Sequence, residues 1–163
     1  MRASVRRHAS IAVPADAAWA VVTRADVLQH WFPGLRQVVM KTPTIRTVTT
    51  AAGLSLDEEI VTNDALQRRF QYRIAGGFFK EHLASIDVIA LAADRCLVTY
   101  SSDADPATMA IVLGGVMEAA LTSLTAQLEA GAGPVLDAIA APPPVPLSES
   151  ESESESESAE VTL

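Results

Sequence analysis

The chain of 163 residues has few of the residues that build disulfide or metal frameworks. Its one cysteine, Cys96, excludes a disulfide within the chain and a zinc site built from several cysteines. The three histidines, His8, His30 and His82, fall on separate predicted elements and lack the spacing of metal ligands. The sequence therefore predicts neither a metal nor a cofactor, and its cysteine usage fits a reducing cytoplasm.

Long apolar runs and familiar catalytic signatures are also missing. No run of eighteen consecutive apolar residues is present, which argues against a membrane span. The basic start is followed by Pro14 and Asp16, where a signal peptide needs an unbroken apolar core, so we expect no export signal. The sequence contains no phosphate-binding loop, no nucleophile elbow and no Cys-x-x-Cys pair, so none of these chemistries is indicated.

The formal net charge of −8 is concentrated at the C-terminal end. Six of the 20 acidic residues lie in residues 147–163, which contain no Lys or Arg. The remainder of the chain then has fourteen acids against 12 basic residues, a balance near −2. Such a balance predicts neither a nucleic-acid surface nor a strongly acidic domain.

The longest helical pattern spans residues 105–131. Asp105 is a suitable N-cap, and Gly131 suits the left-handed conformation that ends many helices. Between them, apolar residues recur at steps of three and four, which predicts one apolar helix face. This face comprises Met109, Leu113, Val116, Met117, Ala120, Leu121, Leu124 and Leu128. Gly114 and Gly115 indicate either a kink or a place where another segment approaches the backbone closely.

Short β patterns precede this helix at intervals of about ten residues. The predicted strands are residues 5–13, 35–41, 45–50, 54–62, 67–74, 80–91 and 96–103, with two short helices between the first and second. The clearest alternation places Phe70, Tyr72 and Ile74 on one face of a strand. The pattern predicts an α+β domain in which an antiparallel sheet of six to seven strands wraps around a long C-terminal helix.

Beyond residue 131 the composition changes. Residues 142–146 contain four prolines and favour an extended polyproline conformation. From residue 147 an alternating Ser-Glu tract follows, which buries no apolar area and repels itself, so we expect it to be disordered. The predicted organisation is one domain over residues 1–131 and a disordered tail over residues 132–163.

Several segments resemble a known superfamily. They are residues 11–19 (IAVPADAAW), 28–35 (LQHWFPGL) and 98–106 (VTYSSDADP), together with Gly53, Glu59, Arg69 and Tyr72. They are similar to the START, Bet v 1 and polyketide cyclase superfamily (SRPBCC), in its polyketide cyclase/dehydrase-like branch. The resemblance covers about residues 3–130 and implies a helix-grip fold, with a cavity for a small apolar or amphipathic molecule between sheet and helix. It implies no shared catalytic residues.

Six residues are candidates for lining such a cavity. They are Trp31, Phe70, Tyr72, Met109, Leu113 and Met117. Methionine side chains adapt to varied apolar ligands, and a tyrosine hydroxyl can donate a hydrogen bond to a ligand carbonyl. Ordinary core packing explains the same pattern, because the cavity of this fold is a hollow part of its core.

Three residues are weak catalytic candidates. Glu58 falls on an apolar strand face, where burial would raise its pKa and suit it to proton transfer. The simpler interpretation is a solvated Glu58, or an ion pair with Arg69 or Arg73. Tyr72 is more simply an aromatic whose hydroxyl reaches the rim. His82 is more simply a surface or edge-strand histidine.

Three functions remain open at this level. The first is binding of a small hydrophobic molecule, such as a lipid or a polyketide-like compound, without catalysis. The second is a polyketide cyclase or dehydratase that uses acid and base groups in the same cavity. The third is an interaction protein with a filled cavity. The sequence predicts no nucleic-acid partner and leaves the oligomeric state open.

Overall fold

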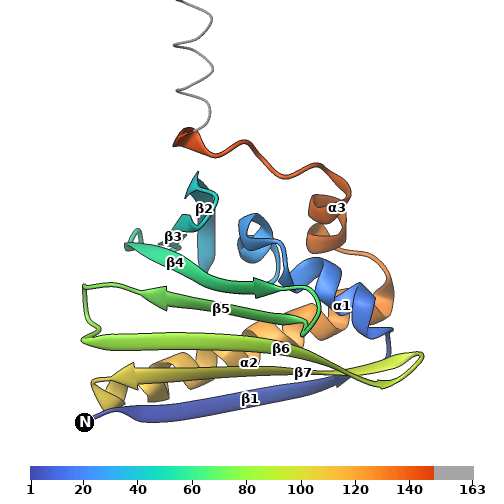
Figure 1. Ribbon diagram of the computed structural model, residues 1–163, viewed down its shortest axis with the longest axis horizontal. Coiled ribbons are helices and arrows are strands. Elements are labelled where there is room, and N and C mark those ends of the chain that lie inside the picture. Colours follow the sequence, from blue (N-terminus) through green and yellow to red (C-terminus); the bar gives the residue numbers. More distant parts are fainter. Residues whose placement is uncertain (149–163) are drawn as a thin grey trace, which may run out of the picture.

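Figure 1 shows the computed structural model, in which residues 1–148 are described. The Ser-Glu tract, expected to be disordered, lies outside the described residues from residue 149 on. The elements in chain order are β1 (Ala3–Ile11), α1 (Ala15–Val22), the 3-10 helix η1 (Ala25–His30), β2 (Leu35–Thr42), β3 (Ile45–Thr50), β4 (Ser55–Asp64), β5 (Arg69–Ile74), β6 (Glu81–Ala92), β7 (Arg95–Asp105), α2 (Ala107–Ala130) and α3 (Pro134–Ala140).

The strands form one 7-stranded sheet in the order β1-β7-β6-β5-β4-β3-β2. All neighbouring pairs are antiparallel. Short turns join consecutive strands from β2 to β7, and the last strand, β7, pairs with the first, β1. Strands β1 and β2 are therefore the two edges. The sheet curves, and α2 runs behind β6 and β7 in Figure 1. The predicted α+β helix-grip architecture, with two short helices after the first strand, is confirmed.

Helix α2 packs against β1 and β7, and its predicted apolar face is buried there except that Met109 and Leu113 are half-buried and Val116 is exposed. Its buried residues are Ala110, Gly114, Met117, Ala120, Leu121, Leu124 and Leu128. Gly131 ends the helix in the left-handed conformation, with φ at 63°, as predicted. By length and composition alone α2 is able to cross a membrane. Here one face of the helix packs against the sheet and contributes to the core.

The start of α2 differs from the prediction. Asp105 is the last residue of β7, paired across the sheet with Glu81, and Pro106 occupies the N-cap position. The carbonyl oxygen of Asp105 accepts a hydrogen bond from the Lys80 backbone amide at 2.8 Å. The strand thus continues to the residue that local capping rules assign to the helix, because pairing with β6 satisfies its backbone.

The two mid-helix glycines have different surroundings. A Cβ added at Gly114 would lie 2.9 Å from Val5 Cγ2 and 2.9 Å from Arg7 Nη2 of β1. A Cβ added at Gly115 would meet nothing within 4 Å. Gly114 therefore marks the close approach of β1 to α2, one of the two explanations that the sequence allowed.

Helix α3 extends the packed part of the chain past residue 131, where the sequence placed the domain boundary. Val135 is fully buried at 0% exposure and belongs to the main hydrophobic core. Its backbone amide donates to Gln127 Oε1 at 2.9 Å. The guanidinium of Arg24 donates to the carbonyl oxygen of Ala141 at 3.0 Å, which fixes the segment after α3 beside η1.

Candidate functional site

The interior of the domain contains polar side chains on inward-facing positions of the sheet. Successive side chains of a strand point to opposite faces, so alternate residues of β3 to β7 face the core. Among residues 1–148, the buried polar or charged residues are Arg46, Glu58, His82 and Ser102. Each occupies such an inward position, surrounded by apolar neighbours. A polar cluster inside an apolar core is the candidate site of this protein.

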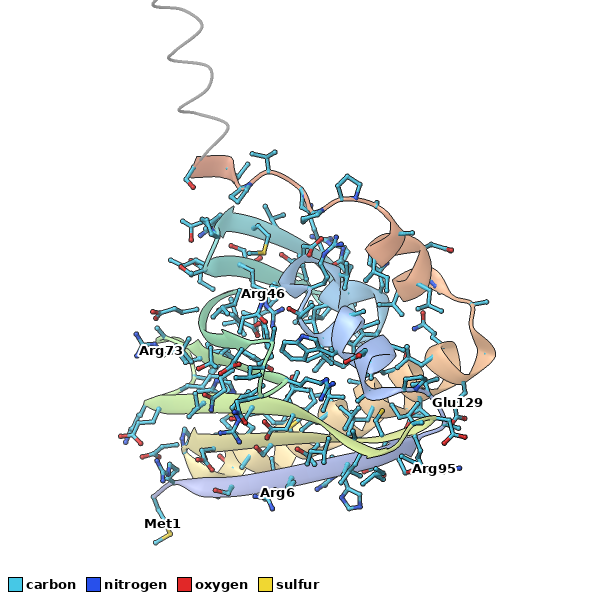
Figure 2. The ribbon with its side chains drawn as sticks, turned by 45° about the vertical axis from the view of Figure 1, so that its right-hand side comes forward. Met1, Arg6, Arg46, Arg73, Arg95 and Glu129 are labelled. Atoms are coloured by element: carbon cyan, nitrogen blue, oxygen red, sulfur yellow. The ribbon has the colours of Figure 1, made fainter. Side chains whose placement is uncertain are left out.

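Arg46 and Glu58 form a buried ion pair, and Figure 2 shows Arg46 inside the domain. They are direct cross-strand partners of β3 and β4, 2% and 5% exposed. Arg46 Nε donates to Glu58 Oε2 at 2.8 Å, and Nη2 makes an ion-pair contact to the same oxygen at 2.7 Å. Nη1 donates to the carbonyl oxygen of Ala25 at 2.8 Å. The pair adds no net charge to the interior.

The partner of Glu58 differs from the expected one. From the sequence we expected Glu58 to be solvated or to pair with Arg69 or Arg73. In the structure Arg69 pairs with Asp87 and Arg73 pairs with Glu59, both on the outer face. Residues on opposite faces of a sheet cannot pair, and of Arg46, Arg69 and Arg73 it is Arg46 that shares the inner face with Glu58.

The Arg46 guanidinium also lies over two aromatic rings. Its central carbon is 5.6 Å from the Phe70 ring centroid and 5.0 Å from the Tyr72 centroid, which are cation–π distances. The Tyr72 hydroxyl lies inside the core and hydrogen-bonds to the Tyr100 hydroxyl, so it does not reach the rim. Burial raises the pKa of both phenols, so both are protonated at neutral pH.

His82 is a buried residue of β6, an inner strand, and not a surface or edge-strand histidine. Its Nδ1 accepts a hydrogen bond from the Ile74 backbone amide at 3.1 Å. The other nitrogen, Nε2, therefore carries the proton and donates to Ser102 Oγ at 3.2 Å. Burial lowers the pKa of His82 to about 4, against a weak opposing effect of Asp103. His82 is neutral at physiological pH.

Trp31 contributes an aromatic ring to the interior and an indole N–H that makes no hydrogen bond. It follows η1, and its ring centroid is 6.5 Å from that of Tyr100 and 6.4 Å from that of Phe32. Its Nε1 is buried and has no hydrogen-bond partner among residues 1–148. A buried donor without a partner is energetically costly, which makes this atom a natural contact for a ligand oxygen.

The predicted lining residues are only partly brought together. Trp31, Phe70, Tyr72 and Met117 belong to one buried core cluster, with Leu113 half-buried against it. Met109 packs against a second, smaller cluster with Phe79 and Ala110 near the start of α2. Leu113 contacts both clusters and connects them.

Sequence reasoning missed Arg46, Tyr100 and Ser102. Their signal was the same period of two that identified Tyr72. Arg46 shares a strand face with Val48, and Tyr100 and Ser102 share one with Val98. Within residues 1–148, no group of three His, Cys, Asp or Glu residues is arranged to hold a metal ion.

Comparison with known proteins agrees with this architecture. The sequence model of a family described as polyketide cyclase / dehydrase and lipid transport matches residues 2–129. A search of curated proteins gave no match.

Three solved structures illustrate the likeness in fold. A START superfamily protein from Mycobacterium smegmatis superposes with a TM-score of 0.69 at 12% identity, covering 78% of this chain and 97% of its own. The ZhuI aromatase/cyclase from Streptomyces sp. R1128 gives 0.68 at 17% identity, covering 79% and 94%. A norcoclaurine synthase mutant from Thalictrum flavum gives 0.61 at 18% identity, covering 80% and 96%. At these identities the likeness establishes the fold alone.

Proposed function

This chain belongs to the polyketide cyclase / dehydrase and lipid transport family of the SRPBCC superfamily, and we propose that it binds a small amphipathic molecule between its sheet and α2. The observation that carries the proposal is the unpartnered Nε1 of Trp31, whose ring centroid lies 6.5 Å from that of Tyr100, the hydrogen-bond partner of Tyr72. These groups offer hydrogen bonds within an interior whose charged residues, Arg46 and Glu58, are already paired. A cytoplasmic location remains part of the proposal.

The charge of the interior selects the class of ligand. Arg46 is the buried cation of the cluster, and Glu58 neutralises it at 2.7 Å. A carboxylate or phosphate on the ligand would have to displace Glu58 and leave that acid buried without its partner. The ligand is therefore uncharged and mostly apolar, with one hydroxyl or carbonyl group, as in a polyketide-like phenol or a neutral lipid.

Access to this interior requires side chains to move, because Trp31, Phe70, Tyr72 and Met117 are buried in the core. The smaller cluster near the start of α2 is the proposed way in. It includes Phe79, next to the exposed Phe78 on the loop that joins β5 to β6, and the half-buried Met109. Few apolar contacts hold this end, so opening it disrupts less of the core.

The geometry favours binding over catalysis. Glu58 is held by Arg46, the pKa of Tyr72 is raised by burial, and the pKa of His82 is lowered to about 4. A general acid or base works best with a pKa near the working pH, which neither Tyr72 nor His82 provides. The cyclase or dehydratase alternative would need the ligand to change these environments.

The first test is native mass spectrometry of the purified full-length protein, with extraction of any small molecule carried with it. Thermal shift then compares two sets of probes: aromatic phenols such as 2-naphthol, and neutral long-chain alcohols. We expect one set to raise the melting temperature. The Tyr100→Phe variant should reduce that rise, and Thr99→Val, on the other face of β7, should not.

Other outcomes separate the alternatives. A probe that is bound and converted with loss of water would indicate the cyclase or dehydratase. A protein that carries nothing and responds to neither set would contradict ligand binding and favour the interaction protein with a filled interior.

A further inference from the structure

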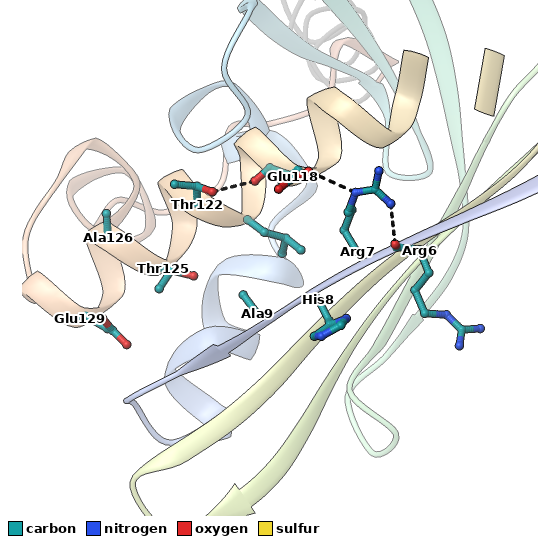
Figure 3. A pocket seen from close by; sticks show the side chains of 10 residues that line it. Arg6, Arg7, His8, Ala9, Glu118, Thr122, Thr125, Ala126 and Glu129 are labelled. Atoms are coloured by element: carbon teal, nitrogen blue, oxygen red, sulfur yellow. Dashed lines mark hydrogen bonds and ion pairs between the residues drawn. The ribbon is translucent and has the colours of Figure 1, made fainter. Parts of the chain in front are cut away.

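A groove of about 680 Å³ runs between β1 and α2 on the outside of the domain, away from the interior cluster (Figure 3). Residues 6–9 of β1 form one wall. The α2 wall contains the small or apolar side chains of Leu121, Thr122, Thr125 and Ala126. The groove therefore has the edge of the sheet on one side and the surface of α2 on the other.

Side chains hydrogen-bond to the backbone along this edge at two places, one within β1 and one at the residue that follows it. Arg7 Nη1 donates to the carbonyl oxygen of Arg6 at 2.9 Å, and Glu129 Oε1 accepts from the Ala12 backbone amide at 2.9 Å. In an antiparallel edge strand, the backbone groups of every second residue point away from the paired strand. The backbone groups of His8 and Ser10 therefore face outward between these two places, ready to pair with another strand.

The charged side chains of the groove, Arg6, Arg7, Glu118 and Glu129, balance in number but are unevenly placed. Figure 3 shows Arg6 and His8 on the side of β1 away from α2, and Arg7 on the side toward it. Arg7 contacts Glu118 at 3.4 Å, so this acid of the α2 wall has a partner. Glu129, at the other end, caps the backbone. Within residues 1–148, Arg6 has no ion-pair partner, so one side of the groove offers an uncompensated cation.

We propose that this groove binds the chain's own Ser-Glu tract, residues 149–158, as a strand added to the edge of β1. Alternate residues of an extended segment face opposite sides. Strict Ser-Glu alternation would then direct every glutamate toward the Arg6 and His8 side and every serine toward α2. Small serine side chains fit beside the α2 wall, and the glutamate carboxylates would face the Arg6 guanidinium on the outer side of β1.

The geometry assigns the tract to a second copy of the chain. Pro143, Pro144 and Pro146 line one pocket together with Met40 and Pro43, at the β2 edge, and β1 is the opposite edge. Crossing six strand spacings takes roughly 29 Å, or about nine extended residues. A tract bound to its own β1 would have few residues left to pair, whereas a second copy has the whole tract available.

Binding of a synthetic peptide tests this. The probe is a biotinylated peptide, SESESESESES, the sequence of residues 148–158, on a biolayer interferometry sensor. The acceptor is the full-length protein with its five tract glutamates from Glu149 to Glu157 changed to Gln, so that its own tract does not compete. We expect saturable binding that weakens with salt, and roughly tenfold weaker binding to the same protein carrying Arg6→Glu and His8→Glu.

Two controls make the outcome decisive. Arg36→Glu changes an exposed arginine on the other edge strand, β2, and should leave binding unchanged. A peptide of the same composition in blocks, SSEESSEESSE, keeps the charge and loses the alternation, so it should bind several-fold more weakly. Absence of binding, equal binding of the two peptides, or an equal effect of Arg36→Glu would each overturn the proposal.

Discussion

At the scale of single residues, the interior of this protein depends on one ion pair in an apolar setting. Arg46 and Glu58 leave water together, so their attraction has to offset the loss of hydration of two charges. The hydrogen bond to the Ala25 carbonyl oxygen and the rings of Phe70 and Tyr72 complete the surroundings of the guanidinium. Removing one partner therefore costs more than the attraction alone suggests.

We predict that Arg46→Met lowers the free energy of unfolding by about 3–5 kcal/mol, because Glu58 is left buried without its partner. Urea unfolding at pH 7 measures this. The double variant, with Glu58→Leu added, should recover most of the loss, since no buried charge then remains. A double variant as unstable as the single one would show that the pair is held by packing and not by charge.

His82 should make stability depend on pH. Its pKa is about 4 in the folded protein and near 6.5 in an unfolded chain, so the unfolded chain binds the proton first as pH falls. The stability that this difference provides is complete above pH 6.5 and is lost between pH 6.5 and 4, up to about 3 kcal/mol. Unfolding measured across this range should depend less on pH in His82→Gln, whereas exposed His8→Gln should behave as wild type.

The sequence predicted these residues unevenly. The alternation of β4 placed Glu58 on the apolar face, and its burial bears this out. Its partner was not predictable, because the match of Arg46 to Glu58 depends on the register between β3 and β4. The burial of His82 was missed for a similar reason, since the position of β6 inside the sheet follows from tertiary pairing.

At the scale of elements, the low helix propensity of a glycine within α2 is explained by the close approach of β1. Glycine in a helix costs about 1 kcal/mol relative to alanine. Gly114 admits the close approach of Val5, whereas Gly115 faces open space. The helix and its end at Gly131 were predictable from spacing alone. Its first residue was not, because β7 extends through Asp105.

This contrast yields a matched pair of variants. Gly115→Ala should raise the free energy of unfolding by about 1 kcal/mol, because it improves helix propensity without a clash. Gly114→Ala should lower it by about 1–2 kcal/mol, because Val5 must shift from a new methyl group 2.9 Å away. Chemical unfolding of both variants checks this, and equal effects would exclude close packing of β1 at Gly114.

At the scale of the whole molecule, the end of the domain is set by packing that composition does not reveal. The sequence predicted an antiparallel sheet of six to seven strands, because alternation and turns mark each strand, and the structure has seven. It placed the domain boundary at residue 131, since the segment after it is short and followed by prolines. The burial of Val135 and the Arg24 contact to Ala141 depend on how α3 meets η1, which no local pattern encodes.

Truncation tests where the domain ends. A chain that stops after Gly131 loses the fully buried Val135, worth about 1.5–3 kcal/mol, and its melting temperature should fall by about 5–10 °C. A chain that stops after Ser148 keeps α3 and should melt within about 2 °C of the full-length protein. Equal melting temperatures for the two truncations would show that α3 contributes nothing to stability.

The unpartnered indole nitrogen of Trp31 also has an optical consequence. The chain has two tryptophans, and Trp19 is only half-buried, whereas Trp31 sits among aromatic rings with its N–H unused. An indole in an apolar setting emits at shorter wavelength than one that donates a hydrogen bond. A molecule that accepts this bond should therefore shift the emission to the red, so occupancy of the interior can be followed without attaching a dye.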